Sequence, residues 1–389
     1  MYMKIKALHV ASFDGNVGDI GQIMGFRQQL SNNTHLEIEY SNLEIREFYN
    51  SWGMRQFGEQ FAKYANCFDL LIFGGGNFWS VEWQYSPNGT TLALSKEILD
   101  QIHIPVWFNA IGFDDRLNFA KNKIKDFAEF IKYIAYDSHK YFISVRNDGS
   151  YKMMSKYFSG EVMRKISEVP DGGFFVNPHC YEEHIECHSK LKTIVINPAG
   201  DMIPIRFTSE AAEVSYIVTF AEQIRILLEK YDDIEIVFVA HHHDDFRHIN
   251  ALIAKLPDWF RRRRISVAPF IPNWHRAEYI FDLYRQAHMV IGGRFHSNLC
   301  AIAQGTPTIG ILSYHKHKYI YDHYLSKDRM LEVDKGEIAN LSYVLDKYMQ
   351  CENYKKACKD NISLQKTLGG ILTENHRLME KWITYFYKK

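Results

Sequence analysis

The amino-acid sequence predicts an α/β protein made of two doubly wound domains that face a cleft. The first observation is its length of 389 residues, which exceeds what one hydrophobic core usually organises. The second is a repeated order of short apolar runs and helical stretches, which is typical of right-handed βαβ units and mostly parallel sheets. The third is that this order starts again near residue 191, after a polar segment without periodicity.

The first domain is expected over residues 1–176. Its strands are short runs of β-branched and aromatic residues, and each run is followed by glycines or polar residues. These runs are Ala7–Val10, Leu70–Phe73, Val106–Phe108 and Phe142–Val145.

The second domain is expected over residues 191–389, and a linker is expected at about 177–190. Helices are predicted at roughly 209–230 and 274–286, and the last 40 or so residues are expected to form helices that close the fold. The predicted strands are Thr193–Ile196, Ile234–Val239, Ile265–Val267, Met289–Ile291 and Thr308–Ile311.

Composition excludes some classes of function. The 46 basic and 46 acidic residues balance, which argues against a surface built to hold nucleic acid. The one dense basic cluster, Arg261–Arg264, is interpreted as a solvated helix end. Six scattered cysteines favour free thiols in a reducing compartment. With no transmembrane stretch, we expect a cytoplasmic location, with peripheral membrane association as the open alternative.

Two loops after strands of the first domain carry candidate acceptor-binding residues. In Asn16-Val17-Gly18-Asp19, the side chains of Asn16 and Asp19 either cap the next helix or face a sugar hydroxyl. In the loop of three glycines, Gly75 and Gly76 precede Asn77 and leave backbone N–H groups uncovered. The glycines of this loop either permit a tight turn or let a sugar or an anion approach the backbone closely.

Arg146 ends another strand of the first domain. Its planar guanidinium suits a carboxylate or phosphate in the cleft, and the alternative is a structural salt bridge with a neighbouring acid. In the second domain, His241 and His242 open a run of histidines and aspartates after a strand. Adjacent residues seldom point at one metal ion, so we expect substrate contacts or helix capping there and no metal site.

The sharpest motif is Gly292-Gly293-Arg294-Phe295-His296-Ser297, between a strand and a helix. Gly293 permits a steep turn, and Arg294 and His296 then stand at a helix N-terminus, which favours an anion. A cation and a titratable imidazole at such a position indicate a functional site. The alternative is that His296 caps or packs the helix. Lys316, after the next strand, is expected to bring a further cation to the same cleft.

The order of these motifs resembles that of the polysaccharide pyruvyl transferase family. The resemblance runs over roughly residues 8–325 and implies a fold similar to GT-B glycosyltransferases, with two Rossmann-like domains. The N-terminal domain would lie on the acceptor side. The matching segments are Asn16-Val17-Gly18-Asp19, Gly74-Gly75-Gly76, Val145-Arg146-Asn147, Arg294-Phe295-His296 and Gly305-Thr306-Pro307.

The resemblance implies an enzyme that moves the enolpyruvyl unit of phosphoenolpyruvate onto a sugar of a cell-surface polysaccharide or its precursor. The product would be a ketal, phosphate would be released, and no cofactor would be needed. By this resemblance, Arg294, His296 and Arg146 would hold phosphoenolpyruvate. Our own hypothesis from the residues adds that the helix N-terminus after Gly293 helps to bind the donor, that His296 supplies or relays a proton, and that Asp19 acts as a base. The acceptor would be a saccharide, free or lipid-linked.

Two alternatives share this architecture. In the first, the same arginines hold the diphosphate of a nucleotide sugar, and the protein is a GT-B-type glycosyltransferase in polysaccharide biosynthesis. In the second, the protein binds a sugar or an anion without catalysis.

Overall fold

The computed structural model describes residues 3–116, 119–182, 184, 186–188, 190–274 and 276–388. The chain divides into two compact units. Unit 1 comprises Met1–Phe13, Phe26–Gly172 and Leu368–Lys389, and unit 2 comprises Asp14–Gly25 and Gly173–Thr367. The predicted linker at 177–190, in which Glu183, Ile185 and Ser189 lie outside the described residues, falls within unit 2.

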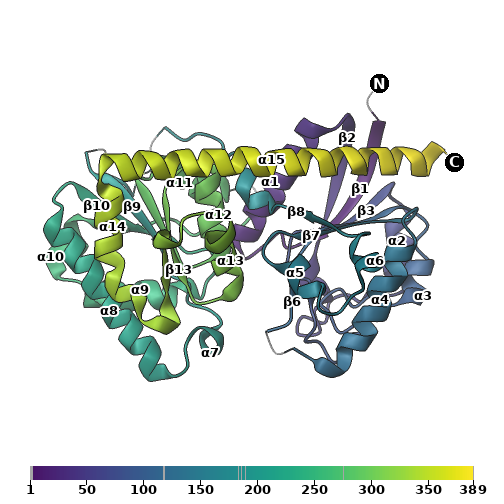
Figure 1. Ribbon diagram of the computed structural model, residues 1–389, viewed down its shortest axis with the longest axis horizontal. Helices are drawn as coiled ribbons and strands as arrows, with labels where there is room; N and C mark the ends of the chain where they lie inside the picture. The colour runs from purple at the N-terminus through teal and green to yellow at the C-terminus, as the bar shows by residue number, and fades with distance from the viewer. Residues whose placement is uncertain are drawn as a thin grey trace. The chain divides into compact units, whose positions relative to one another are not determined.

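Unit 1 is built on a six-stranded parallel sheet with the order β2-β1-β3-β5-β7-β8. The chain moves outward from β1 to β2 and then returns to β3, so the strand order reverses between β1 and β3 (Figure 1). The strands are β1 (Met3–Ala11), β2 (Leu36–Glu44), β3 (Leu70–Gly74), β5 (Val106–Ile111), β7 (Tyr141–Arg146) and β8 (Ser167–Val169), and a separate pair is formed by β4 (Trp79–Ser80) and β6 (Phe113–Asp114).

Both faces of this sheet are covered. On β1, Leu8 and Val10 belong to one core cluster and Ile5 and Ala7 to another, because alternate side chains of a strand point to opposite faces. The helices and 3-10 turns of this part of the chain are α1 (Val17–Asn33), η1 (Ile45–Phe48), α2 (Glu59–Ala65), α3 (Lys96–Asp100), η2 (Lys121–Lys123), α4 (Ile124–Tyr136), α5 (Ser150–Met154), α6 (Gly160–Met163) and η3 (Gly172–Phe175). The residues of α1 up to Gly25 and those of η3 from Gly173 belong to unit 2.

Unit 2 has a second six-stranded parallel sheet, with the order β11-β10-β9-β12-β13-β14. This is the 3-2-1-4-5-6 order of the Rossmann fold, and it reverses between β9 and β12. The strands are β9 (Lys192–Asn197), β10 (Ile234–Phe238), β11 (Ile265–Val267), β12 (Met289–Gly292), β13 (Thr308–Leu312) and β14 (Met330–Glu332).

Helices cover both faces of this sheet as well. Ile194 and Ile196 of β9 pack into one core cluster, and Val195 between them packs into the other. The doubly wound α/β class predicted from the sequence is therefore confirmed. The helices and 3-10 turns are α7 (Ile203–Arg206), α8 (Glu210–Lys230), α9 (Asp245–Lys255), α10 (Asp258–Arg263), α11 (Glu278–Gln286), α12 (Phe295–Ala303), α13 (His315–His323), η4 (Lys327–Arg329), η5 (Val333–Lys335), η6 (Glu337–Asn340), α14 (Leu341–Met349) and α15 (Cys351–Lys388).

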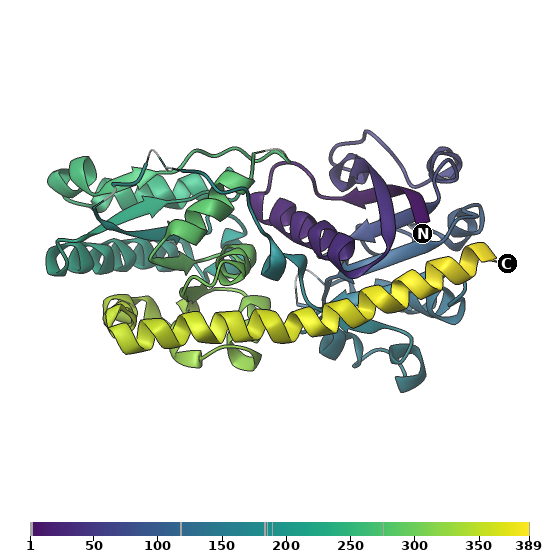
Figure 2. The ribbon, with the colours of Figure 1, turned by 90° about the horizontal axis from the view of Figure 1, so that it is seen from above.

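Among the described residues, none of the helices combines the length and the apolar character needed to cross a bilayer. The longest, α15, is a single helix of 38 residues that is shared by both units (Figure 2).

Candidate functional site

The candidate site lies at the carboxyl edge of the unit 2 sheet, where the strand order reverses between β9 and β12. Ligands of open α/β sheets bind at such a reversal. The loops after these two strands touch, because the backbone N–H of Gly293 donates to the carbonyl oxygen of Asn197 at 2.8 Å. A Cβ atom on Gly293 would lie 2.8 Å from that oxygen, so only glycine allows this approach.

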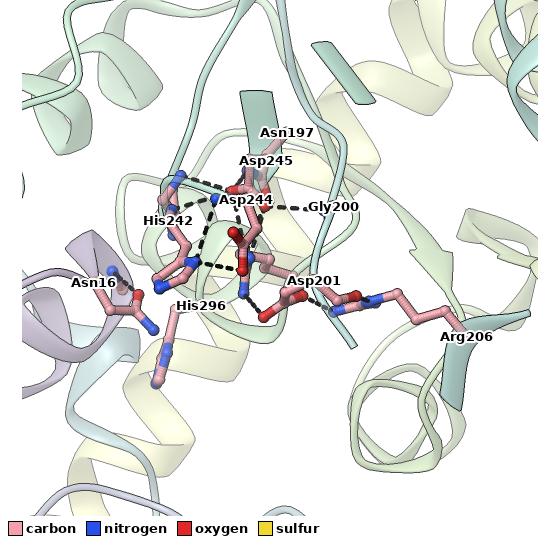
Figure 3. Close-up of polar contacts among 12 residues, drawn as sticks. Asn16, Asn197, Gly200, Asp201, Arg206, His242, Asp244, Asp245 and His296 are labelled. Carbon is pink, nitrogen blue, oxygen red and sulfur yellow. Dashed lines mark hydrogen bonds and ion pairs between the residues drawn. The ribbon is translucent and has the colours of Figure 1, made fainter. Parts of the chain in front are cut away.

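A cluster of two guanidiniums and two carboxylates occupies this edge (Figure 3). Arg294 donates to Asp245 through Nε and Nη2, at 2.9 and 2.6 Å, and to Asp201 through Nη1 at 2.9 Å. Arg206 donates to the same Asp201 carboxylate at 3.0 Å. Asp201 therefore bridges the two arginines, and the charges of the cluster balance.

Asp245 is the buried centre of this cluster. Its carboxylate also accepts backbone N–H groups from Gly200 at 3.0 Å and His241 at 2.9 Å, and the Asn197 amide at 3.2 Å. Burial raises the pKa of Asp245, but Arg294 and these N–H donors outweigh burial and lower the pKa to about 2. For Arg294, burial lowers the pKa, and the two acids raise it by more, so the guanidinium stays charged.

His296 stands beside this cluster in the first turn of α12. Its Nδ1 atom lies 3.7 Å from Oδ1 of Asp19, and the two side chains are 11% and 18% exposed. Figure 3 shows His296 on the side of the cluster that faces Asn16. The Asn-x-Gly-Asp and Arg-x-His motifs therefore meet within unit 2. An imidazole and a carboxylate that both reach solvent can exchange protons with a bound substrate.

The start of α1 has a capping hydrogen bond of its own and a second hydrogen bond that holds it against this site. The side-chain oxygen of Asn16 accepts from the backbone N–H of Gly18 at 2.9 Å, so Asn16 caps the helix. The backbone N–H of Val17 donates to the carbonyl oxygen of His241 at 3.0 Å. These contacts support the capping role of Asn16, and they place Gly18 directly on the His296 ring.

For an enzyme that uses His296, Gly18→Ala is expected to lower kcat by roughly 10- to 100-fold, because a small displacement of a group that acts in the reaction is costly. The new Cβ atom would lie 2.5 Å from Cβ and 2.9 Å from Nδ1 of His296, so the imidazole would have to move. Steady-state kinetics would measure the loss. Gly370→Ala in α15 is the control, since its Cβ atom would meet nothing within 4 Å. Equal kcat values for the two variants would contradict the packing role of Gly18.

The structure corrects the expectation that His241 contacts an acceptor sugar. His241 is fully buried, and its Nε2 atom lies 2.6 Å from the Tyr284 hydroxyl oxygen. Burial lowers the pKa of His241 to about 3, so the ring is neutral and belongs to the core. His242 is more exposed and lies 3.3 Å from Asp244. No group of three His, Cys, Asp or Glu side chains in the described part of the chain is arranged to hold a metal ion.

The first turn of α13 brings two further side chains to the interior of unit 2. Lys316, predicted to be a cation in the cleft, is almost completely buried. His317 beside it is also buried, with its ring 5.8 Å from that of Phe295. Burial, followed by the charges of Arg206 and Arg294, holds the pKa of His317 well below its usual value, so this imidazole is neutral.

The candidate residues of unit 1 have structural partners. Arg146 is buried and donates to Asp148 at 2.8 Å and to Asp171 at 3.2 Å, which is the structural alternative considered for this residue. Gly75 has φ +80°, and its N–H donates to the carbonyl oxygen of Asn109 at 3.2 Å.

The rest of the glycine loop is equally constrained. A Cβ atom on Gly76 would lie 2.3 Å from the Phe78 ring, and the half-buried Asn77 follows. The loop lies after β3, at the reversal of the unit 1 strand order. Its tight backbone accounts for both glycines, and contact with an acceptor sugar stays a prediction for all three residues.

Sequence reasoning missed Asp201 and the central role of Asp245. Asp201 follows β9 by four residues, so its place after the carboxyl end of a strand was the available signal. The structure also brings Arg206 into the same cluster, through its ion pair with Asp201.

Solved structures with a similar fold are sugar-nucleotide enzymes of low sequence identity. A UDP-N-acetylglucosamine 2-epimerase from Listeria monocytogenes, described as putative, is 10% identical with a TM-score of 0.55 over 94% of this chain and 95% of its own. The α,α-trehalose 6-phosphate synthase of Burkholderia multivorans is 8% identical with a TM-score of 0.57 over 99% and 98%. The UDP-GlcNAc 2-epimerase of Neisseria meningitidis, bound to UDP-GlcNAc, is 10% identical with a TM-score of 0.52 over 98% and 100%. These similarities show a GT-B-like fold and nothing about the reaction.

No curated protein matches the sequence. A sequence model described as polysaccharide pyruvyl transferase matches residues 16–316. This span extends from Asn16 at the start of α1 to Lys316 in α13, and so includes the whole candidate site. With most of its length in this match, the chain belongs to the polysaccharide pyruvyl transferase family.

Proposed function

We propose that this protein transfers the pyruvyl group of phosphoenolpyruvate onto a saccharide, forms a ketal, and releases phosphate. The observation that carries the proposal is the pairing of His296 with Asp19 beside two arginines, within the span that matches the family. An acid–base pair next to cations is what protonation of an anionic enol ether requires.

The contacts of Asp201 support the proposal that Arg294 and Arg206 bind an anion. Its carboxylate bridges Arg294 and Arg206 at 2.9 and 3.0 Å, as a carboxylate or phosphate of the donor would. The Asp201 side chain is 20% exposed, whereas that of Asp245 is fully buried. A donor would therefore displace Asp201 and leave Asp245 to hold Arg294 in place. Donor contact by Arg146 would require its guanidinium to exchange one of its two buried acid partners for the donor.

The reaction follows from this arrangement in three steps. His296 delivers a proton to the methylene carbon of phosphoenolpyruvate, and C2 becomes an oxocarbenium-like electrophile. A sugar hydroxyl then adds to C2 and passes its proton to Asp19, which shares it with His296. A second hydroxyl replaces the phosphate at C2, the C–O bond to phosphate breaks, and the second hydroxyl proton leaves with the phosphate as HPO₄²⁻. Protons and charge balance without an oxidant or reductant.

Thermal unfolding with phosphoenolpyruvate tests donor binding. At 100 times its Kd, a ligand that binds only the native state stabilises it by about 2.7 kcal/mol. We expect this rise with phosphoenolpyruvate and a much smaller one with phosphate, UDP-sugars or GDP-sugars. Arg206→Lys should reduce the rise, because lysine lacks the planar fork that shares an anion with Arg294. Arg225→Lys, at a partly exposed arginine in α8 that pairs with Glu222, is the matched control.

Product analysis tests the transfer itself. The protein would be incubated with phosphoenolpyruvate and a panel of free and lipid-linked saccharides, and phosphate release and ketal formation would be followed by colorimetry and mass spectrometry. A rise in stability only with a nucleotide sugar, followed by glycosyl transfer, would contradict pyruvyl transfer and favour a glycosyltransferase. Donor binding with no phosphate release for any acceptor would favour a non-catalytic binding protein.

A further inference from the structure

The C-terminal helix α15 has two different sides. One side carries the buried residues that join it to the rest of the protein, and the other carries mostly exposed polar and basic residues. The buried residues recur every three or four positions, as in an amphipathic helix, and are Ala357, Asn361, Leu364, Leu368, Leu372, Asn375, His376, Met379 and Ile383.

The exposed side is strongly basic, although the whole chain is neutral. Its exposed acids are only Glu352 and Glu374, and Glu374 pairs with Arg377. None of the exposed lysines of α15 forms an ion pair with a residue that the structure describes. The exposed basic residues are Lys355, Lys356, Lys359, Lys366, Arg377, Lys381 and Lys388, and we call them the basic stripe.

The spacing places most of the basic stripe on one line along the helix. From Lys355 the positions advance by 4, 7, 11, 4 and 7 residues to Lys388. Each step is close to a whole number of turns of 3.6 residues, so these side chains project in nearly the same direction. The stripe thus extends along nearly the whole 38-residue helix.

A row of exposed apolar side chains flanks the basic stripe in the second half of α15. Ile371, Leu378 and Tyr385 recur every seven residues and are 47%, 42% and 54% exposed. Large apolar side chains beside a row of lysines are typical of helices that lie in a membrane interface. A partner recognised by charge alone, such as a nucleic acid backbone, would leave this apolar row without a contact.

We propose that the exposed side of α15 binds the surface of an anionic phospholipid bilayer, with the helix lying in the plane of the membrane. The lysines and Arg377 would contact lipid phosphates, and the apolar row would enter the boundary between headgroups and acyl chains. This inference rests on the helix surface and does not depend on the proposed pyruvyl transfer.

Vesicle flotation tests the proposal with the full-length protein. We expect binding to vesicles that contain phosphatidylglycerol, weak binding to phosphatidylcholine alone, and weaker binding in high salt, because salt screens the attraction. The triple variant Lys359→Gln, Lys366→Gln, Lys381→Gln should bind anionic vesicles about 100-fold more weakly, since each basic residue near such a surface contributes roughly fivefold.

The matched control removes three exposed lysines from unit 1, with Lys63→Gln, Lys121→Gln and Lys125→Gln. It should retain most of the binding, and both triples should unfold at the same temperature as the wild type. A second variant, Ile371→Ser with Leu378→Ser, should lose the binding that persists in high salt. The proposal would be overturned by an equal loss in both triples, by undiminished binding of the stripe variant, or by equal binding to phosphatidylcholine.

Discussion

His296→Asn is expected to lower kcat for phosphate release by roughly 10²- to 10⁴-fold, the range that a positioned general acid contributes. The fold should persist, because asparagine is smaller than histidine and the His296 side chain reaches solvent, with 11% of its surface exposed. Donor binding should also persist, because the Arg206–Asp201–Arg294 bridge does not involve the imidazole. Initial rates with phosphoenolpyruvate would measure turnover, and thermal unfolding would measure donor binding.

His323→Asn is the matched control for this experiment. His323 is exposed in the last turn of α13, and its imidazole contacts the carbonyl oxygen of Tyr319. A double variant with Asp19→Asn adds a test of cooperation. If His296 and Asp19 act as one unit, the double variant should lose little more activity than His296→Asn alone. A near wild-type kcat for His296→Asn would rule out the acid–base role.

The interior strands of both sheets could be predicted from sequence, whereas three of the four edge strands could not. Central strands such as β3 and β12 are buried along their whole length, so they appear in the sequence as continuous apolar runs. The strand β2 is at the edge of its sheet, and its residues Leu36–Glu44 mix charged and apolar side chains because much of the strand is exposed. The edge strands β8 and β14 are only three residues long. These three edge strands were not predicted, whereas the equally short edge strand β11 was predicted with its correct bounds.

The sequence also did not reveal to which unit the start of α1 and the end of the chain belong. Residues 14–25 group with unit 2 although they follow the first strand of unit 1. The end of α15 packs Met379 and Ile383 against Ile5 and Ala7 of β1, at the far end of the sequence. No local sequence pattern reveals such long-range packing. Each predicted domain was therefore one continuous segment of the sequence.

The position of the candidate site could be predicted from the sequence, but the acidic side chains that neutralise its arginines could not. Motifs after parallel strands must gather at one sheet edge, and this rule placed Arg294 and His296 correctly after β12. The partner that takes most of the Arg294 hydrogen bonds, Asp245, lies 49 residues away and looked like a helix cap. Arg146 and His241 likewise contact buried side chains that are distant in the sequence, and only the tertiary structure reveals these contacts.

Asp245→Asn is expected to destabilise the protein by about 3–5 kcal/mol, the usual result of removing one partner of a buried ion pair. The variant would leave Arg294 with one charged partner, Asp201, and would put an amide among the donors of Gly200 and His241. Urea unfolding near neutral pH would measure the loss. Because the folded-state pKa is about 2 and the unfolded value is about 4, the ion pair stabilises the protein above about pH 4. The difference between wild type and variant should shrink as the pH falls from about 4 to about 2.

Asp244→Asn provides a control one residue away with the same change in charge. The Asp244 side chain is 59% exposed and forms an ion pair with the ring of His242, so its substitution should leave the unfolding free energy nearly unchanged. Equal destabilisation by the two substitutions would indicate a general effect of charge at the start of α9. A large loss confined to Asp245→Asn, and diminishing at acidic pH, would show that this buried carboxylate holds Arg294 and the loops after β9 and β10 together. Such a result would make Asp245 the fixed support of the site and leave Asp201 as the carboxylate that an anionic donor can replace.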